Sequence, residues 1–168
     1  MINIFEVKEV SHIKEVADLA YTIWNQHYTP IIGKEQVDYM ITNFQSQEAI
    51  KEQIDGEHRY FLAYYDKEAV GYFAVVPEPE TDSLFLSKFY IDKDFRGRGI
   101  GRQCLMYMEN ICQEDGLKRI WLTVNKYNNN TIRAYESLGF KKVEELVQDI
   151  GNGFIMDDYK MEKIVGAY

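Results

Sequence analysis

The chain of 168 residues has no long hydrophobic run. Its longest apolar stretch, "AVGYFAVV", falls well short of the roughly 18 residues that a membrane-spanning helix needs. The N-terminal segment "MINIFEVKEV" contains Lys8 and Glu9, which do not belong in the apolar core of a signal peptide. The sequence therefore predicts a protein that has no membrane partner.

Cysteine is scarce, with Cys104 and Cys112 as the two examples. Both are expected on one helix, where a separation of eight residues puts their Cα atoms ~12 Å apart. That distance is too long for a disulfide. We therefore expect two reduced core thiols and a cytoplasmic location.

Basic residues are outnumbered, because 19 Lys and Arg face 27 Asp and Glu, which gives a formal net charge of -8. Binding to a phosphate backbone requires a basic face, so the charge argues against nucleic acid as a partner. The long-range field instead favours cationic partners.

Linkers, repeats and low-complexity tracts are also missing. Hydrophobic residues make up 46% of the chain and aromatic residues 14%, enough for a packed core. One domain over residues 1–168 is the expected organisation.

Hydrophobic periodicity predicts an α+β domain with a partly parallel sheet. Ser11 and Ser46 are expected to cap the first and third helices. Helices are predicted at residues 12–28, 34–44, 46–54, 100–112 and 129–139. Strands are predicted at residues 2–8, 59–65, 68–77, 83–91, 119–124, 140–147 and 154–164. The break after the first helix is assigned to Pro30 and Gly33.

The stretch "DFRGRGIGRQ", residues 94–103, puts a glycine loop between a predicted strand and a predicted helix. Glycine lets backbone N–H groups turn toward an anion, and the helix N-terminus and nearby guanidinium groups favour the same ligand. Its alternating members are Arg96, Gly97, Arg98, Gly99, Gly101 and Arg102. The loop therefore predicts a phosphate or diphosphate site, and the alternative is a turn with solvated arginines.

Two common phosphate motifs do not fit this loop. The dinucleotide fingerprint G-x-G-x-x-G needs its third glycine one residue later than Gly101. The mononucleotide P-loop needs Lys followed by Ser or Thr after its last glycine, and Arg102 and Gln103 stand there instead.

The segment "FYIDKDFRGRGIGRQCL" resembles the acetyl-CoA loop of the GNAT superfamily of N-acetyltransferases, whose pattern [QR]-x-x-G-x-[GA] is matched by Arg96, Gly99 and Gly101. Downstream, "LTVNKYNNNTIRAYESLGF" resembles the second family motif. Its matching residues are Asn128, Thr131, Ile132, Tyr135, Gly139 and Phe140. The resemblance covers nearly all of the chain from Arg59 onward.

This resemblance implies a GNAT fold: a single-domain three-layer α-β-α sandwich with a mixed, partly splayed central sheet. It also implies acetyl-CoA or coenzyme A as co-substrate, with no metal. The implied cofactor-binding residues are Phe89, Tyr90, Ile91, Arg96, Gly97, Arg98, Gly99, Ile100, Gly101, Arg102 and Asn128. For Asn128 the alternative is a helix cap, a role that Asn129 and Asn130 could equally fill.

The implied reaction transfers an acetyl group to a primary amine by direct attack in a ternary complex. The departing thiolate needs a proton, and Tyr135 stands at the family's position for that acid; its alternative is a packed aromatic. The base is left open. Where many family members have Glu, this chain has Ser87, and a water chain to Glu78, Glu80 or Tyr90 could serve instead. His27 and His58 are titratable, but a lone histidine is more often a satisfied surface or core residue.

The acceptor is expected to be a small-molecule amine. Residues 23–40 and 149–162 are similar to PaiA-type polyamine acetyltransferases, which implies spermidine or spermine. A negative funnel formed by "PEPETD" and "VEELVQD" would attract a polycation, and a solvated acidic surface is the alternative. A protein N-terminus, a lysine side chain and a non-catalytic acetyl-CoA sensor remain open as alternatives. A homodimer is a further expectation.

Overall fold

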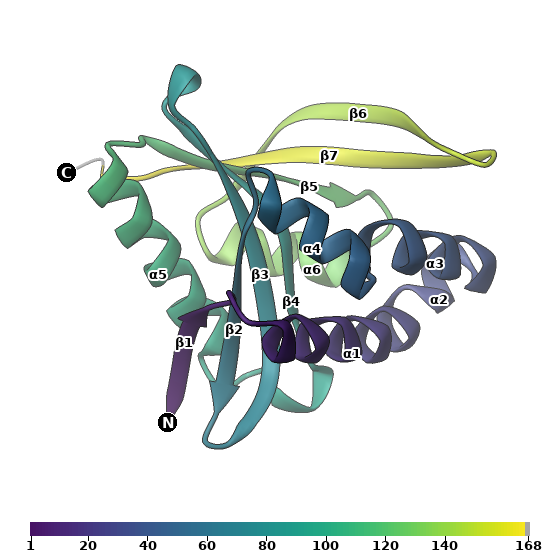
Figure 1. Ribbon diagram of the computed structural model, residues 1–168. Helices are drawn as coiled ribbons and strands as arrows, with labels where there is room; N and C mark the ends of the chain where they lie inside the picture. Colours follow the sequence, from purple (N-terminus) through teal and green to yellow (C-terminus); the bar gives the residue numbers. More distant parts are fainter. Residues whose placement is uncertain (167–168) are drawn as a thin grey trace. The chain divides into compact units, whose positions relative to one another are not determined.

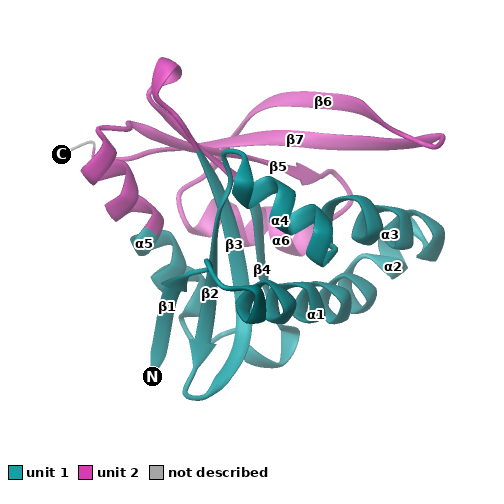
Figure 2. Cartoon of the chain, in the orientation of Figure 1, with its two compact units in different colours: residues 1–76, 88–107 teal, residues 77–87, 108–168 magenta. Residues whose placement is uncertain are grey.

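The computed structural model describes residues 1–166 and divides by its internal contacts into two compact units (Figure 2). Unit 1 comprises residues 1–76 and 88–107, and unit 2 comprises residues 77–87 and 108–168. Among the described residues, the strands form a seven-stranded mixed sheet in the order β1-β2-β3-β4-β5-β7-β6. The predicted α+β class and mixed sheet are thus confirmed.

Unit 1 contains β1 (Ile2–Glu6), β2 (Arg59–Tyr65) and β3 (Glu68–Glu78, whose last two residues belong to unit 2). The three strands are antiparallel, with Ile4 opposite Ala63 and Phe61 opposite Phe73. The strands predicted at residues 59–65 and 68–77 are confirmed, and Asp66, in the turn between them, takes a left-handed φ of 56°. The fully buried rings of Phe61 and Phe73 stack at 4.9 Å in this part of the core.

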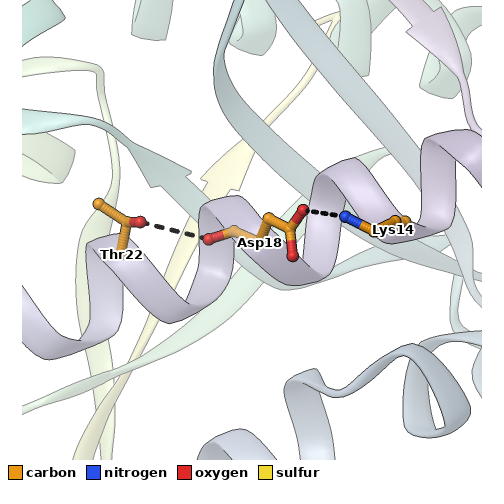
Figure 3. Close-up of polar contacts among 3 residues, drawn as sticks. All are labelled: Lys14, Asp18 and Thr22. Atoms are coloured by element: carbon orange, nitrogen blue, oxygen red, sulfur yellow. Dashed lines mark hydrogen bonds and ion pairs between the residues drawn. The ribbon is translucent and has the colours of Figure 1, made fainter.

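The first helix, α1 (Val10–His27), begins earlier than predicted. Its N-cap is Glu9, so the assignment of Ser11 as the cap was wrong; Ser11 lies inside the first turn. The buried residues of α1 recur at helical spacing: Ile13, Val16, Leu19, Ala20, Ile23 and Trp24. On the exposed face, Lys14 Nζ lies 2.9 Å from Asp18 Oδ2, and Thr22 donates to the Asp18 carbonyl (Figure 3). Pairs of this kind add little stability, because water screens them.

Three short helices follow: α2 (Thr29–Ile32), α3 (Lys34–Met40) and α4 (Gln47–Asp55). Pro30 lies in the first turn of α2, where its missing N–H costs nothing, so it begins a helix instead of only ending one. The predicted helix over residues 34–44 is two elements, because a π-helical turn, Ile41–Gln45, follows α3. Ser46 caps α4 as predicted, accepting from the Ala49 N–H at 3.2 Å.

Strand β4 (Ser83–Ile91) and helix α5 (Ile100–Asp115) have residues in both units. One face of α5 is buried in the core: Ile100, Cys104, Leu105, Met108, Ile111 and Cys112. Both cysteines are free thiols, as predicted.

Unit 2 contains β5 (Arg119–Asn125), α6 (Asn129–Ser137), β6 (Lys141–Gly151) and β7 (Phe154–Ile164). The first residues of β4 run parallel to β5, with Ser83 opposite Arg119. β5 and β6 both pair antiparallel with β7, and β6 and β7 form a long hairpin (Figure 1). Gly139 ends the α6 segment with a φ of 103°, as the sequence predicts. Within residues 1–166 no helix combines the length and hydropathy that crossing a bilayer requires.

Candidate active site

The glycine loop lies in unit 1 between the end of β4 and the start of α5. Gly97 and Gly99 have φ values of 79° and 80°, a left-handed conformation that residues with a Cβ rarely adopt. A Cβ added at either position would meet nothing within 4 Å, so the space beside this backbone is open. The first amides of α5 have no partners within the helix. The loop therefore has the conformation and the open space that a bound phosphate requires.

The residues before the loop hold its entry in place. Asp92 accepts a hydrogen bond from the Asp94 N–H at 3.0 Å and begins a short 3₁₀ turn, Lys93–Phe95. The Asp92 N–H in turn donates to the Val70 carbonyl on β3 at 2.8 Å. The end of β4 is thus fixed to β3 before the chain enters the loop.

The three arginines of the loop are exposed, but two of them also make contacts within unit 1. Arg96 Nε lies 3.4 Å from the Ile91 carbonyl, and the Arg98 guanidinium lies 5.1 Å from the ring centroids of Tyr65 and Phe95. Arg102 lies in the first turn of α5. A guanidinium held on rings keeps its charge near the loop with less freedom to lose on binding an anion.

The predicted cofactor strand residues lie close to the loop. A Cβ on Gly101 would come within 3.4 Å of Ile91 Cδ1 and 3.9 Å of Phe89 Cζ. On β3, a Cβ on Gly71 would lie 2.9 Å from the Tyr90 carbonyl oxygen, closer than real contacts allow. The two glycines therefore let α5 and β3 approach the end of β4, and unit 1 brings Phe89, Tyr90 and Ile91 together with the loop.

Tyr90 points away from α5 into an aromatic cluster. Its ring centroid lies 5.3 Å from Trp24, 6.0 Å from Tyr28 and 5.4 Å from Tyr72. His27 stacks edge-on against Tyr28 at 4.8 Å, which places this sequence candidate at the margin of the cluster. The cluster joins the end of α1 to β4, so the first helix contributes directly to this side of the strand.

A buried lysine, which we did not predict, lies two residues before Tyr90. Lys88 is 7% exposed, and its Nζ donates to the carbonyl of Phe44, to Gln53 Oε1 at 2.9 Å and to the Tyr60 hydroxyl. Burial lowers the pKa of Lys88 to about 7. In the sequence, the one indication that this lysine is buried was the pair "SK" within an otherwise apolar strand.

His58, the second histidine candidate, is affected by the same environment. Its pKa is lowered first by burial and then by the nearby charge of Lys88, while Glu57 acts in the opposite direction. His58 is therefore held toward its neutral form, which is unremarkable for a half-buried histidine.

Unit 2 carries the other predicted site residues. Asn128 is 2% exposed and is the N-cap residue of α6, yet its side chain makes no capping hydrogen bond, so the capping alternative is not supported. Tyr135, on α6, is 9% exposed, and its ring lies 5.5 Å from Phe140. The packed-aromatic alternative for Tyr135 is thus compatible with the structure.

The candidates for the base lie in different surroundings. Glu78 accepts a hydrogen bond from Trp121 Nε1 at 2.8 Å in unit 2, whereas Glu80 is exposed in a 3₁₀ turn. The Trp121 ring also stacks on Phe85 at 4.2 Å. Glu78 therefore positions a tryptophan. In residues 1–166 there is no group of three or more His, Cys, Asp or Glu side chains arranged to hold a metal ion.

The fold, the loop and the second motif together define a class of protein. The family model described as "Acetyltransferase (GNAT) family" matches residues 18–140. The chain belongs to this family, and its fold is the GNAT fold.

Curated relatives resemble part of the chain. A "Probable spermine N(1)-acetyltransferase" from Bacillus subtilis subsp. natto is 31% identical over 90 residues, which cover 49% of this chain and 59% of that protein. A "[Ribosomal protein bS18]-alanine N-acetyltransferase" from Salmonella typhimurium is 36% identical over 61 residues, 36% of this chain and 41% of that protein. The matched region thus spans little more than half the length of the first relative.

Two solved structures each match nearly the whole chain. The PaiA N-acetyltransferase from Thermoplasma acidophilum in complex with coenzyme A superposes with a TM-score of 0.78 at 21% identity. The match covers 98% of this chain and 99% of that one. A GNAT acetyltransferase from Staphylococcus aureus Mu50 has a TM-score of 0.74 at 18% identity, over 98% and 99% of the two chains. At these identities the likeness establishes the fold alone.

Proposed function

We propose that this chain is an acetyl-CoA-dependent N-acetyltransferase whose acceptor is a primary amine of a polyamine such as spermidine or spermine. The main support for this proposal is the glycine loop, in which left-handed Gly97 and Gly99 lead into the N-terminus of α5. Because backbone amides, helix N-terminus and guanidinium groups all favour an anion, a diphosphate such as that of coenzyme A suits the loop.

We assign a role to each predicted site residue. In unit 1, Arg96 through Arg102 would hold the diphosphate, and the backbone of Phe89, Tyr90 and Ile91 would bind the pantetheine arm. We also propose Asn128 as a cofactor-binding residue and Tyr135 as the group that donates a proton to the departing sulfur. Bound acetyl-CoA supplies the acetyl thioester. We propose residues 1–168 as one catalytic domain on this basis.

The polyamine acceptor is supported by the relatives and by charge. The spermine acetyltransferase from Bacillus subtilis subsp. natto is similar over 49% of this chain. The formal net charge of -8 favours a polycation over a neutral or anionic acceptor. A second candidate is a protein N-terminus, which the similarity to the bS18-alanine N-acetyltransferase favours. A homodimer and a cytoplasmic location stay predictions.

Replacing Gly99 by valine tests the loop. The strained φ and the added branches would weaken coenzyme A binding, measured by calorimetry, by more than tenfold, or ~1.4 kcal/mol. Gly116→Val is the matched control, because Gly116 also has a left-handed φ, of 70°, with nothing within 4 Å of an added Cβ. Both variants carry the same backbone strain, so only a loss confined to Gly99→Val indicates the site. Equal affinities in folded Gly99→Val and wild type would refute the assignment.

A further inference from the structure

A buried carboxyl group in unit 2 has no role in the mechanism described so far. Asp158 lies on β7 and is 4% exposed. Its position is central among three strands, opposite Asn125 on β5 and Leu146 on β6. A carboxylate is almost never buried to this extent unless it is paired, ligated or used.

The hydrogen bonds of Asp158 leave part of the carboxyl group unused. The exposed side chain of Thr123 on β5 makes a hydrogen bond with the carboxyl group. Among residues 1–166, Oδ1 of Asp158 has no hydrogen-bond partner. An oxygen that is buried without a partner is costly, and native proteins keep such atoms mainly where a ligand or a water uses them.

The face of the sheet that carries Asp158 is polar. Strand pleating places Asp158 and Lys160 on the same face as Trp121, Thr123 and Asn125, and Lys160 Nζ lies 4.7 Å from the Trp121 ring centroid. Glu78 also reaches this face through its hydrogen bond to Trp121. Tyr159 points to the opposite face, where Lys126 and Lys142 lie over its ring at 5.5 and 4.6 Å.

The charges beside Asp158 partly cancel. Lys126 Nζ lies 2.8 Å from Asp157 Oδ1 and 3.8 Å from Glu145 Oε1, so its charge is shared with two other carboxylates. Burial, followed by the Asp157 charge, raises the pKa of Asp158 to about 6, while Thr123 and Lys126 act in the opposite direction. The group is therefore a carboxylate at neutral pH that can take up a proton readily.

We propose that Asp158 is the general base of the acetyl transfer, with Oδ1 accepting a proton from the attacking amine nitrogen. The assignment rests on the proposed acetyl transfer but not on the identity of the amine. Asp158 would thus supply the carboxylate that Ser87 cannot. As the N–C bond forms, one proton passes from nitrogen to Oδ1. The C–S bond then breaks, the electron pair leaves on sulfur, and Tyr135 protonates the thiolate. Solvent restores both side chains to their starting states.

The pH dependence of kcat/KM for spermidine and for a primary monoamine tests this role. An alkyl ammonium with a pKa near ~10.4 must lose a proton, so log(kcat/KM) rises with a slope of about one throughout the range from pH 5 to 8. Below the pKa of Asp158, protonation of the base adds a second unit of slope, so the plot of log(kcat/KM) against pH bends at that pKa. Asp158→Asn is expected to lower kcat/KM at pH 8 by ~10²-fold and to leave a single slope.

Two further variants are expected to shift the pH of this bend in opposite directions. Asp157→Asn, the matched control, removes a negative charge beside Asp158; it is expected to retain the rate and to move the bend to lower pH. Thr123→Val removes a hydrogen bond that favours the carboxylate, so the bend is expected to move to higher pH. A group that only supports packing would change neither position. If Asp158→Asn does not fold, the two shifts alone decide the matter.

The outcomes are distinguishable from a failure of the proposed function. A wild-type protein that acetylates no amine refutes the proposed function and, with it, the role of Asp158. A wild type that acetylates amines refutes the base assignment alone if folded Asp158→Asn keeps the wild-type rate. The same holds if the bend stays in place in both Asp157→Asn and Thr123→Val.

Discussion

Lys88 Nζ lies 2.9 Å from Gln53 Oε1, and this hydrogen bond joins strand β4 to helix α4 inside unit 1. The carbonyl of Phe44, in the π-helical turn, accepts from the same nitrogen, and Gln53 Nε2 also donates to that carbonyl at 3.2 Å. The three acceptors of Lys88 are neutral groups, so no anion offsets the cost of burying an ammonium ion. This polar cluster ties the turn between α3 and α4 to the strand that precedes the glycine loop.

Lys88 is expected to make stability rise with pH. Its pKa is about 7 in the folded protein against an ordinary value of 10.5, so between these values the unfolded chain binds more protons. The free energy of unfolding therefore increases as pH rises through this window, by up to about 1.4 kcal/mol per pH unit. Denaturant unfolding at pH 7, 8 and 9 would show the slope in wild type and its loss in Lys88→Met.

Lys51→Met is the control for that scan. Lys51 lies on α4 and is 61% exposed in its ion pair with Asp55, so its removal changes the number of charges without touching the cluster. Wild type and Lys51→Met should share one pH slope. If Lys88→Met keeps that slope too, Lys88 is not held neutral by burial.

The two cysteines are expected to be unreactive in the folded protein. Burial raises the pKa of both Cys104 and Cys112 to about 12, with Glu109 and Asp115 adding to the effect at Cys112. Since the thiolate is the reactive form, a thiol reagent at pH 8 should label the native protein far more slowly than the unfolded chain. Rapid labelling of either residue would show that the α5 core opens. The result also matters in practice, because free coenzyme A thiol can then be followed without a background from the protein.

Tyr135→Phe tests the proposed acid. Without its hydroxyl the departing sulfur loses its proton donor, so kcat should fall ~10²-fold while coenzyme A affinity stays near wild type. Tyr127→Phe is the control, because Tyr127 is 68% exposed and removes the same hydroxyl nearby in sequence. Parallel losses of affinity and rate would instead indicate that Tyr135 only packs against Phe140.

Much of the fold could be predicted because hydrophobic periodicity and turn residues act locally. The β2–β3 hairpin, the strand at residues 83–91 and the cap at Ser46 followed from nearest neighbours in the sequence. The start of α1 could not be predicted in this way. Glu9 and Ser11 both lie near the first turn, and the sequence does not show which of them is the N-cap residue. The π-helical turn at Ile41–Gln45 also escaped prediction, because long-range hydrogen bonds from Gln53, Tyr72 and Lys88 stabilise it.

Some features of the candidate site could also be predicted from the sequence, and others could not. The glycine loop could be found because left-handed backbone demands glycine, which leaves a direct mark on the sequence. Lys88 and Asp158 left no such mark, since their burial depends on strands that pair over long distances in the chain. A lysine in an apolar strand and an aspartate in "MDDYKM" resemble ordinary surface residues until the sheet is assembled.

Initial rates with spermidine and with a monoamine of similar length, at low and at moderate salt, test whether this chain acetylates a polyamine. Exposed charges are screened over ~8–10 Å near physiological ionic strength, so a polycation attracted by the net negative charge of the chain should lose affinity as salt rises. We expect release of coenzyme A thiol with formation of the acetylated amine, a higher kcat/KM for spermidine, and a spermidine KM that increases with salt. Equal kcat/KM values with no salt response would contradict the polyamine assignment, and no acetylated product from any amine would contradict the enzyme assignment itself.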